Sequence, residues 1–297
     1  MTGDGRPGYE RPANLEEALA LLARLGEHAV PLAGGTDVAL RLRHGLVGAE
    51  HTLVDLGCID LDGLEERGDA LVLGAAVRIA DIRSSPLVGR RTPLLCEATA
   101  EFGSPQIRGR ATLGGNLGNA SPVADLAPAL VALGARITLA SQGGTRELAV
   151  EDFPSGPGKT VRRPDELITE VTVPFQRGPG AYERLVYRRQ LAIAVASVAV
   201  HMEVREGRVS WARVAAGAVA PRVLPCPRTA EALLGMAANE SAPVQVATAV
   251  QALATETFPI SDARASRAYR VGALGEALRV ALGRVRGEQG GVVSRES

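Results

Sequence analysis

The chain has 297 residues, 46% of them hydrophobic and 22% charged, which suits about two folded domains and excludes wholesale disorder. Lys plus Arg number 33 and Asp plus Glu number 33, so no excess of positive charge points to nucleic acid or to an anionic membrane. The three cysteines, Cys58, Cys96 and Cys226, lie far apart without metal-ligand spacing, so neither a disulfide framework nor a zinc or iron–sulfur site is predicted.

The first predicted elements are a helix, a strand and a glycine turn. Residues 1–12 lack the basic start and apolar run of a signal peptide. Asn14 and Glu17 have the spacing of a capping box, and the leucines that follow make one apolar face that ends near Gly26. A strand over 29–32, a turn over 33–37 and a helix from Val38 come next. In such an arrangement the backbone N–H groups of the turn can face an anion.

The middle of the chain is predicted to alternate between strands and helices around a second glycine segment. We expect strands at 52–56, 71–75, 136–139 and 167–173, and helices at 93–100 and 125–133. The second glycine segment lies among them and consists of Thr112, Leu113, Gly114, Gly115 and Asn116.

A domain boundary is predicted in the Gly- and Pro-rich segment 176–180, which divides the chain into domains over 1–177 and 180–287. Beyond it, apolar strands at 198–204 and 209–215 flank Arg205-Glu206-Gly207-Arg208, a pattern typical of a hairpin. Helices are expected at 229–236, 243–255 and 265–285. The longest uncharged apolar stretch, 191–200, is far shorter than the roughly 20 residues of a membrane-spanning helix, so we expect no membrane insertion and a cytoplasmic protein.

The two glycine segments carry the main chemical signal. Glycine lets a ligand approach the backbone without a Cβ in the way, and successive N–H groups can bind diphosphate oxygens without Lys or Arg. A Gly-Gly pair is more often an ordinary turn, but two pairs in one domain favour a dinucleotide. Neither segment has the spaced glycines of the Rossmann fingerprint, and Gly158-Lys159-Thr160 lacks the upstream glycine of a phosphate-binding loop, so it is predicted as a plain loop.

Three polar residues, Asn119, Ser121 and Asp125, follow the second glycine segment. Two interpretations of Asp125 stay open: it helps to start a helix, or its carboxylate accepts hydrogen bonds from ribose hydroxyls. No nucleophile elbow and no metal-binding histidine pair is present, so no catalytic residue and no metal ligand is predicted. Trp211 and Phe102 are expected in the core.

These motifs together resemble one known family. The segment Pro31-Leu32-Ala33-Gly34-Gly35-Thr36-Asp37, the second glycine segment with Asn119 and Ser121, and Asp125-Leu126 resemble the FAD-binding medium subunit of molybdenum hydroxylases. That family includes the carbon monoxide dehydrogenase flavoprotein and the flavin domain of xanthine dehydrogenase. The segment 217–222 resembles the signature of its C-terminal domain, and the resemblance extends over about residues 9–285.

The resemblance implies an α+β fold: a two-subdomain FAD-binding domain of the vanillyl-alcohol-oxidase (PCMH) type, followed by a smaller α+β C-terminal flavoprotein domain. It implies that both glycine segments hold the FAD diphosphate, that Asp125 binds the ribose or adenine part, and that Phe102, Ile168 and Arg184 lie in the flavin region. Arg184 stands where the family usually has Lys, so the positive charge is kept in a planar form. The expected cofactor-binding residues are Pro31, Leu32, Ala33, Gly34, Gly35, Thr36, Asp37, Val38, Phe102, Thr112, Leu113, Gly114, Gly115, Asn116, Asn119, Ser121, Asp125, Ile168 and Arg184.

The resemblance also implies a function and partners. The chain would be the electron-transfer flavoprotein of a heterotrimer, taking electrons from a small subunit with two iron–sulfur clusters and passing them to an external acceptor. A large subunit would hold the molybdenum cofactor and oxidise the substrate. Two alternatives are a stand-alone FAD-dependent oxidase and a non-catalytic nucleotide-binding module.

Overall fold

The computed structural model describes residues 6–100, 102–188, 192–238 and 242–287, and the chain forms two compact units. Unit 1 consists of Met1–Arg91, Thr99–Ser121 and Gly134–Phe175, and unit 2 of Thr92–Ala98, Pro122–Leu133 and Gln176–Ser297. Two short middle segments therefore pack with the C-terminal part of the chain. The domain limits 1–177 and 180–287 stay a prediction.

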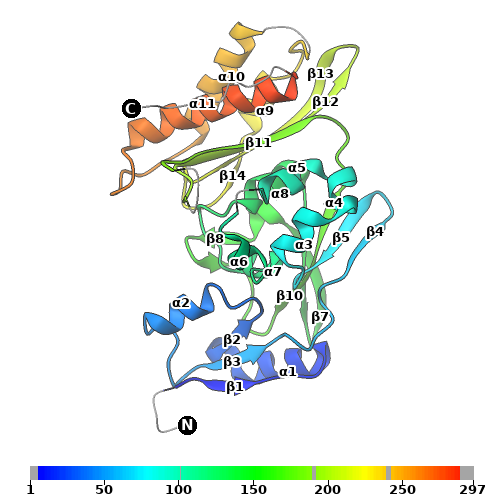
Figure 1. Ribbon diagram of the computed structural model, residues 1–297, viewed down its shortest axis with the longest axis vertical. Coiled ribbons are helices and arrows are strands. Elements are labelled where there is room, and N and C mark those ends of the chain that lie inside the picture. Colours follow the sequence, from blue (N-terminus) through cyan, green and yellow to red (C-terminus); the bar gives the residue numbers. More distant parts are fainter. Residues whose placement is uncertain (1–5, 101, 189–191, 239–241, 288–297) are drawn as a thin grey trace. The chain divides into compact units, whose positions relative to one another are not determined.

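Unit 1 begins with a small parallel sheet and a capped helix (Figure 1). The Asn14 Oδ1 accepts a hydrogen bond from the Glu17 amide at 2.9 Å, and the Glu17 carboxylate accepts one from the Ala13 amide at 2.8 Å. Both the predicted cap and the buried apolar face of the helix are thereby confirmed. The elements are α1 (Leu15–Leu25), the strands in the order β1 (Gly8–Glu10), β3 (Thr52–Asp55) and β2 (Ala29–Leu32), and α2 (Val38–Arg43).

A five-stranded antiparallel sheet is the largest sheet of unit 1. Its strands lie in the order β4 (Leu64–Arg67), β5 (Ala70–Gly74), β10 (Leu167–Pro174), β6 (Arg136–Ser141) and β7 (Gly144–Ala149). A separate pair is β8 (Pro154–Gly156) with β9 (Lys159–Thr160). The helices of this region are α3 (Ile79–Ser84), α4 (Pro86–Arg91), α6 (Pro105–Arg108) and α7 (Leu113–Gly118).

Unit 2 is a four-stranded antiparallel sheet with helices on both faces (Figure 1). The side chains of Val198, Val200 and Met202 join a core formed with the C-terminal helices, whereas the opposite face of the central strands meets the helix that ends at Leu133. The strands lie in the order β11 (Gly180–Leu185), β12 (Ala196–Arg205), β13 (Arg208–Gly217) and β14 (Leu224–Pro225). The helices are α5 (Pro93–Ala98), α8 (Leu126–Leu133), α9 (Pro227–Ala232), α10 (Pro243–Glu256) and α11 (Arg267–Val285).

The structure corrects several local predictions. The second glycine pair lies inside α7 and does not form the ordinary turn that is usual for a Gly-Gly pair. Lys159 and Thr160, predicted as loop, pair with β8 as strand β9. Trp211, expected in the core, is 38% exposed, with its ring edge against His201 at a centroid distance of 5.2 Å. Phe102 is only half-buried.

Across the described parts of the chain, every helix is too short or too polar to cross a bilayer.

Candidate functional site

The first glycine turn joins β2 to α2 in unit 1, and its two glycines are required for different reasons. A Cβ on Gly34 would lie 1.9 Å from the backbone oxygen of Arg110, so the chain's own close approach excludes any side chain there. Gly35 has a φ of +75°, which other residues rarely adopt, and a Cβ there would meet only Leu32 Cδ1 at 3.4 Å. Gly34 is therefore required by close packing, and Gly35 by its left-handed backbone conformation.

The backbone amides of three successive residues in this turn indicate an anion-binding site. Among the residues that the structure describes, no acceptor takes the N–H groups of Gly34, Gly35 and Thr36. Backbone donors need partners, and adjacent N–H groups at a turn with a left-handed residue form a concave site for phosphate oxygens. Three such donors can satisfy phosphate oxygens without any cationic side chain.

The amides of the second glycine segment are already used within the protein. Gly114 is required because a Cβ there would lie 2.7 Å from the Cβ of Ala75. The hydrogen bonds run from Leu113 to the Val77 carbonyl (2.9 Å), from Gly114 to the Ala75 carbonyl (2.8 Å), from Gly115 to the Thr112 hydroxyl (3.1 Å) and from Asn116 to the Thr112 carbonyl (2.9 Å). This segment therefore offers a ligand its side chains and not its backbone donors.

Asn116 supplies the complementary polar group. Its Oδ1 is buried and has no hydrogen-bond partner among the described residues, although buried polar atoms are nearly always paired. One helical turn later, Asn119 Nδ2 donates to Asp37 Oδ1 at 3.0 Å, which ties the end of α7 to the first turn. Asn116 and Asn119 share one helix face, so the unpaired acceptor lies on the side of α7 that faces the first turn.

These observations test whether the expected FAD fits. A dinucleotide offers phosphate oxygens, which accept hydrogen bonds, and ribose hydroxyls, which donate them. Counting only partners in the described ranges, unit 1 offers three unpaired backbone donors in the first turn and an unpaired acceptor on Asn116. The donor and acceptor chemistry of unit 1 therefore fits FAD.

Three further predicted residues lie in unit 1. Ile168 is buried in β10, next to the bulge at Thr169, and a Cβ on Gly118 would lie 3.7 Å from its Cδ1, so it packs against the end of α7. The Phe102 carbonyl accepts a hydrogen bond from Arg108 Nη1 at 2.8 Å. Ser121 is half-buried and is the last residue of the unit 1 segment Thr99–Ser121.

Asp125 and Arg184 lie in unit 2, where they form a buried ion pair. Arg184 Nη1 donates to Asp125 Oδ1 at 3.0 Å, and the two side chains are only 6% and 15% exposed. The Tyr182 hydroxyl donates to the same oxygen at 3.2 Å, and Arg184 also donates to the Ala192 carbonyl at 3.3 Å. Asp125 thus has a role that neither sequence interpretation included: it neutralises and orients Arg184.

Tyr182 completes this cluster and was missed by the sequence reasoning. Burial raises its pKa well above the ordinary value, and the negative charge of Asp125 adds to that rise. The phenol therefore stays protonated and serves as a hydrogen-bond donor. Residues two apart on a strand share a face, so the position of Tyr182 beside Arg184 on β11 was the available signal.

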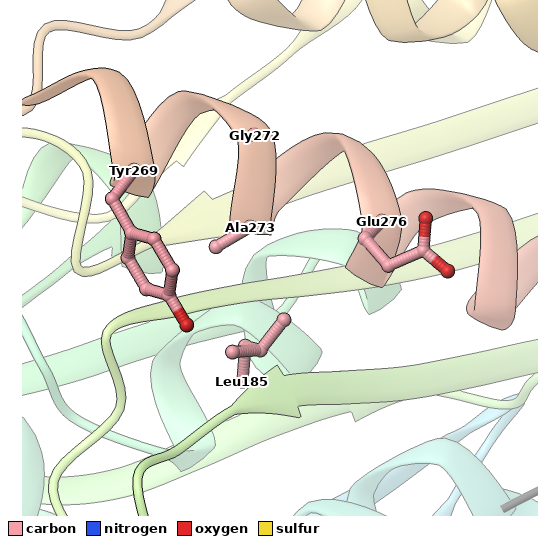
Figure 2. A pocket seen from close by; sticks show the side chains of 5 residues that line it. All are labelled: Leu185, Tyr269, Gly272, Ala273 and Glu276. Carbon is pink, nitrogen blue, oxygen red and sulfur yellow. The ribbon is translucent and has the colours of Figure 1, made fainter. Parts of the chain in front are cut away.

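Unit 2 also holds a pocket of about 200 Å³ between β11 and α11 (Figure 2). Its lining is mostly apolar, with one carboxylate at its edge, and consists of Leu185, Tyr269, Gly272, Ala273 and Glu276. No predicted cofactor residue lines it, and it is smaller than the 300 Å³ or so typical of ligand sites. We therefore assign it no part in cofactor binding.

No group of three or more His, Cys, Asp or Glu side chains suited to a metal ion occurs within the described ranges. Of the cysteines, Cys58 is exposed, Cys96 is half-buried and Cys226 is buried.

Comparisons with known proteins cover nearly the whole chain. Residues 4–176 match the family described as the FAD binding domain in molybdopterin dehydrogenase, and residues 181–285 match the CO dehydrogenase flavoprotein C-terminal domain. The carbon monoxide dehydrogenase medium chain of Hydrogenophaga pseudoflava is 34% identical over 92% of this chain and 95% of that protein. The nicotine 6-hydroxylase medium subunit of Paenarthrobacter nicotinovorans is 32% identical over 91% and 94%. The structure of reconstituted CO dehydrogenase from Oligotropha carboxidovorans matches with a TM-score of 0.91 and 31% identity, over 96% of this chain and 99% of that one.

Proposed function

The chain belongs to the family of FAD-binding medium subunits of molybdenum hydroxylases, and we propose that it is the electron-transfer flavoprotein subunit of a heteromeric enzyme of this kind. The family, the α+β fold class and FAD as cofactor were all expected from the family resemblance and are confirmed by these matches. The relatives act in oxidoreductase complexes, which supports the same class of enzyme here.

One observation carries the proposal: within the described residues, no hydrogen-bond acceptor is found for the three adjacent amides of Gly34, Gly35 and Thr36. Oriented backbone donors hold a diphosphate without a cationic side chain and leave no mobile charge beside the cofactor. Asn116 lies on the facing side of α7, and its buried oxygen is proposed to accept from a ribose hydroxyl.

Bound FAD supplies the redox chemistry, and the protein supplies binding, orientation and electrostatics. In unit 1, the two glycine segments, Asn119 and Ser121 are proposed to hold the nucleotide, and Phe102 and Ile168 to pack beside the flavin. We also propose Arg184, in unit 2, as a cofactor-binding residue, with its guanidinium held on Asp125 at 3.0 Å.

The relatives are named medium chains of their enzymes, which supports partner subunits for this chain. We propose a large subunit with the molybdenum cofactor and a small subunit with two iron–sulfur clusters, in a cytoplasmic heterotrimer. We keep the proposed domain limits at 1–177 and 180–287.

Anaerobic mixing tests this function. The FAD-loaded chain alone should keep its oxidised flavin spectrum with aldehydes, N-heterocycles or carbon monoxide. When the partner subunits are added, the substrate of the complex should bleach the flavin. Bleaching of the lone chain by an organic substrate would overturn the proposal in favour of a stand-alone oxidase.

A further inference from the structure

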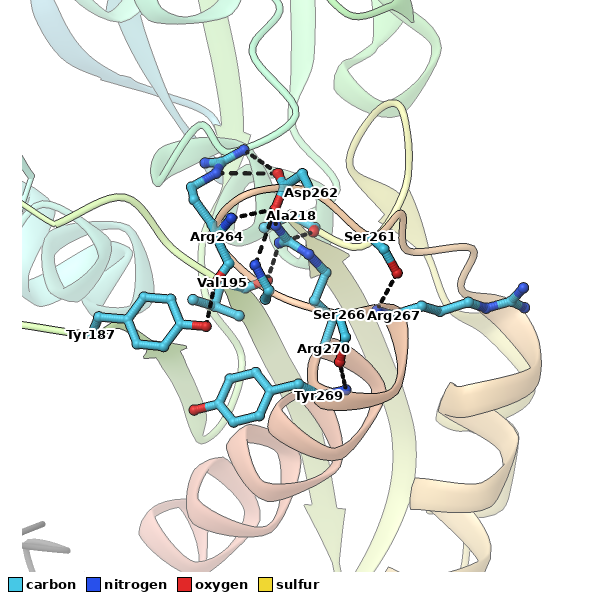
Figure 3. Close-up of polar contacts among 11 residues, drawn as sticks. Tyr187, Val195, Ala218, Ser261, Asp262, Arg264, Ser266, Arg267, Tyr269 and Arg270 are labelled. Atoms are coloured by element: carbon cyan, nitrogen blue, oxygen red, sulfur yellow. Dashed lines mark hydrogen bonds and ion pairs between the residues drawn. The ribbon is translucent and has the colours of Figure 1, made fainter.

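Arg270, on α11 in unit 2, is a buried cation with contacts to three separate segments (Figure 3). Its side chain is only 2% exposed. Nη1 donates to the Val195 carbonyl at 2.7 Å and to the Ala218 carbonyl at 3.2 Å, and Nη2 donates to Asp262 Oδ1 at 2.8 Å. A buried charge persists only where such partners compensate its lost hydration.

Two of these contacts fix segments that adjoin the Asp125–Arg184 pair. Val195 follows Ala192 by three residues, and the Ala192 carbonyl accepts from Arg184 Nη1 at 3.3 Å. Ala218 has a φ of +63°, unusual for a residue with a side chain, and its amide donates to the Pro122 carbonyl at 2.9 Å. Pro122 lies three residues before Asp125. One guanidinium thus holds the segments on which both members of the ion pair depend.

Tyr187, two residues after the end of β11, is held by two further contacts. The Tyr187 hydroxyl donates to the Arg264 carbonyl, and its ring stacks on Tyr269 with centroids 6.0 Å apart and planes 13° apart (Figure 3). Arg264 is held in turn by Asp262, through Nε at 3.2 Å and Nη2 at 3.1 Å. The Arg270 contact lowers the pKa of Asp262 below its ordinary value, so Asp262 stays ionised between the two arginines.

We propose that Arg270 is a positioning residue for the cofactor site. Through its contacts with Val195 and Ala218 it fixes the orientation of the Asp125–Arg184 pair, and the contacts of Tyr187 support the same arrangement. This rests on the proposed function, because it takes Arg184 to be a cofactor-binding residue. Arg270 itself touches neither the cofactor nor a reacting atom.

The test compares FAD dissociation constants and the visible circular dichroism of bound flavin in the full chain. Arg270→Lys keeps the positive charge but loses the planar guanidinium, whose N–H groups donate to two carbonyls and a carboxylate. Its FAD dissociation constant should therefore rise about tenfold, and the circular dichroism band of the bound flavin should change. Tyr187→Phe, at an exposed position, loses one hydroxyl contact and should show about a threefold rise. It keeps the inference testable if Arg270→Lys does not fold.

Thr229→Val is the matched control, because it removes a buried contact in unit 2, the 2.6 Å hydrogen bond to Glu256, that involves none of these segments. It should lower the thermal midpoint and leave FAD affinity and dichroism unchanged. The inference is overturned if the Arg270 and Tyr187 variants bind FAD like the wild type, or if Thr229→Val weakens binding equally. Arg184→Met distinguishes this inference from the proposed function. If Arg184→Met weakens FAD binding while the Arg270 variants bind FAD normally, only this inference is overturned. If the wild-type chain binds no FAD, the proposed function is overturned as well.

Discussion

Removing Asp125 should destabilise the FAD-free chain far more than the loss of a helix cap would. Asp125→Ala leaves Arg184, 6% exposed, without its counter-ion at 3.0 Å and Tyr182 without its acceptor at 3.2 Å. Breaking a buried ion pair by removing one partner costs about 3–5 kcal/mol. Because Asp125 is 15% exposed, we expect the lower end, about 3 kcal/mol.

A double-mutant cycle isolates the interaction. Arg184→Met removes the charge and keeps much of the packing volume, and the double variant leaves no unpaired charge. The free energies of unfolding from urea titrations should show a coupling of roughly 2 kcal/mol, so the double variant is more stable than the two single losses predict.

Three accounts of Asp125 make different predictions in this assay. As a helix cap only, Asp125→Ala would cost about 1 kcal/mol, with no coupling to Arg184. As a ribose ligand only, it would leave the FAD-free chain unchanged and weaken FAD binding alone. Additive losses, or a single loss under about 1 kcal/mol, would refute the ion-pair account.

Three further predictions concern the turn, the unpaired acceptor and a buried histidine. Gly35→Val and its control Gly45→Val, at φ values of +75° and +69°, should each lose about 1–2 kcal/mol of stability, but in an FAD titration only Gly35→Val should weaken binding at least tenfold. Asn116→Leu should leave the urea stability of the FAD-free chain unchanged or higher, because it removes an unpaired buried oxygen, and should weaken FAD binding; a clear loss of stability without FAD would contradict this. Burial lowers the pKa of His201, so below about pH 6.5 the unfolded chain binds a proton that the folded chain does not. Its unfolding free energy should therefore fall by up to about 1.4 kcal/mol per pH unit as the pH drops from about 6.5, and His201→Gln should flatten that slope in urea titrations at several pH values.

Local sequence signals predicted the elements that depend on neighbouring residues. Asn14 and Glu17 marked the start of α1, and the cap bonds are present. The β12–β13 hairpin was predicted from its turn, in which Glu206 and Gly207 both have positive φ as a tight hairpin requires. In contrast, the charged strand β4 (Leu64–Arg67) was missed, because an edge strand with exposed charges lacks an apolar pattern.

The candidate site was predicted in part, because its residues are set by long-range packing. The glycine motif located the first turn, but it could not show that Gly34 is required by the close approach of Arg110 and Gly35 by its positive φ. No local pattern links Asp125 to Arg184, which are 59 residues apart. Arg270 gave no signal at all, since an arginine on a helix is normally solvent-exposed and this one is 2% exposed.

The flavin content of the purified chain tests the central claim most directly. The chain should take up one FAD per polypeptide. The bound flavin is followed by the visible absorbance of the protein, and its amount is determined from the flavin released on denaturation. That absorbance should fall sharply in Gly35→Val and persist in Gly45→Val. A folded, colourless chain that gains no visible absorbance when titrated with FAD would contradict the account.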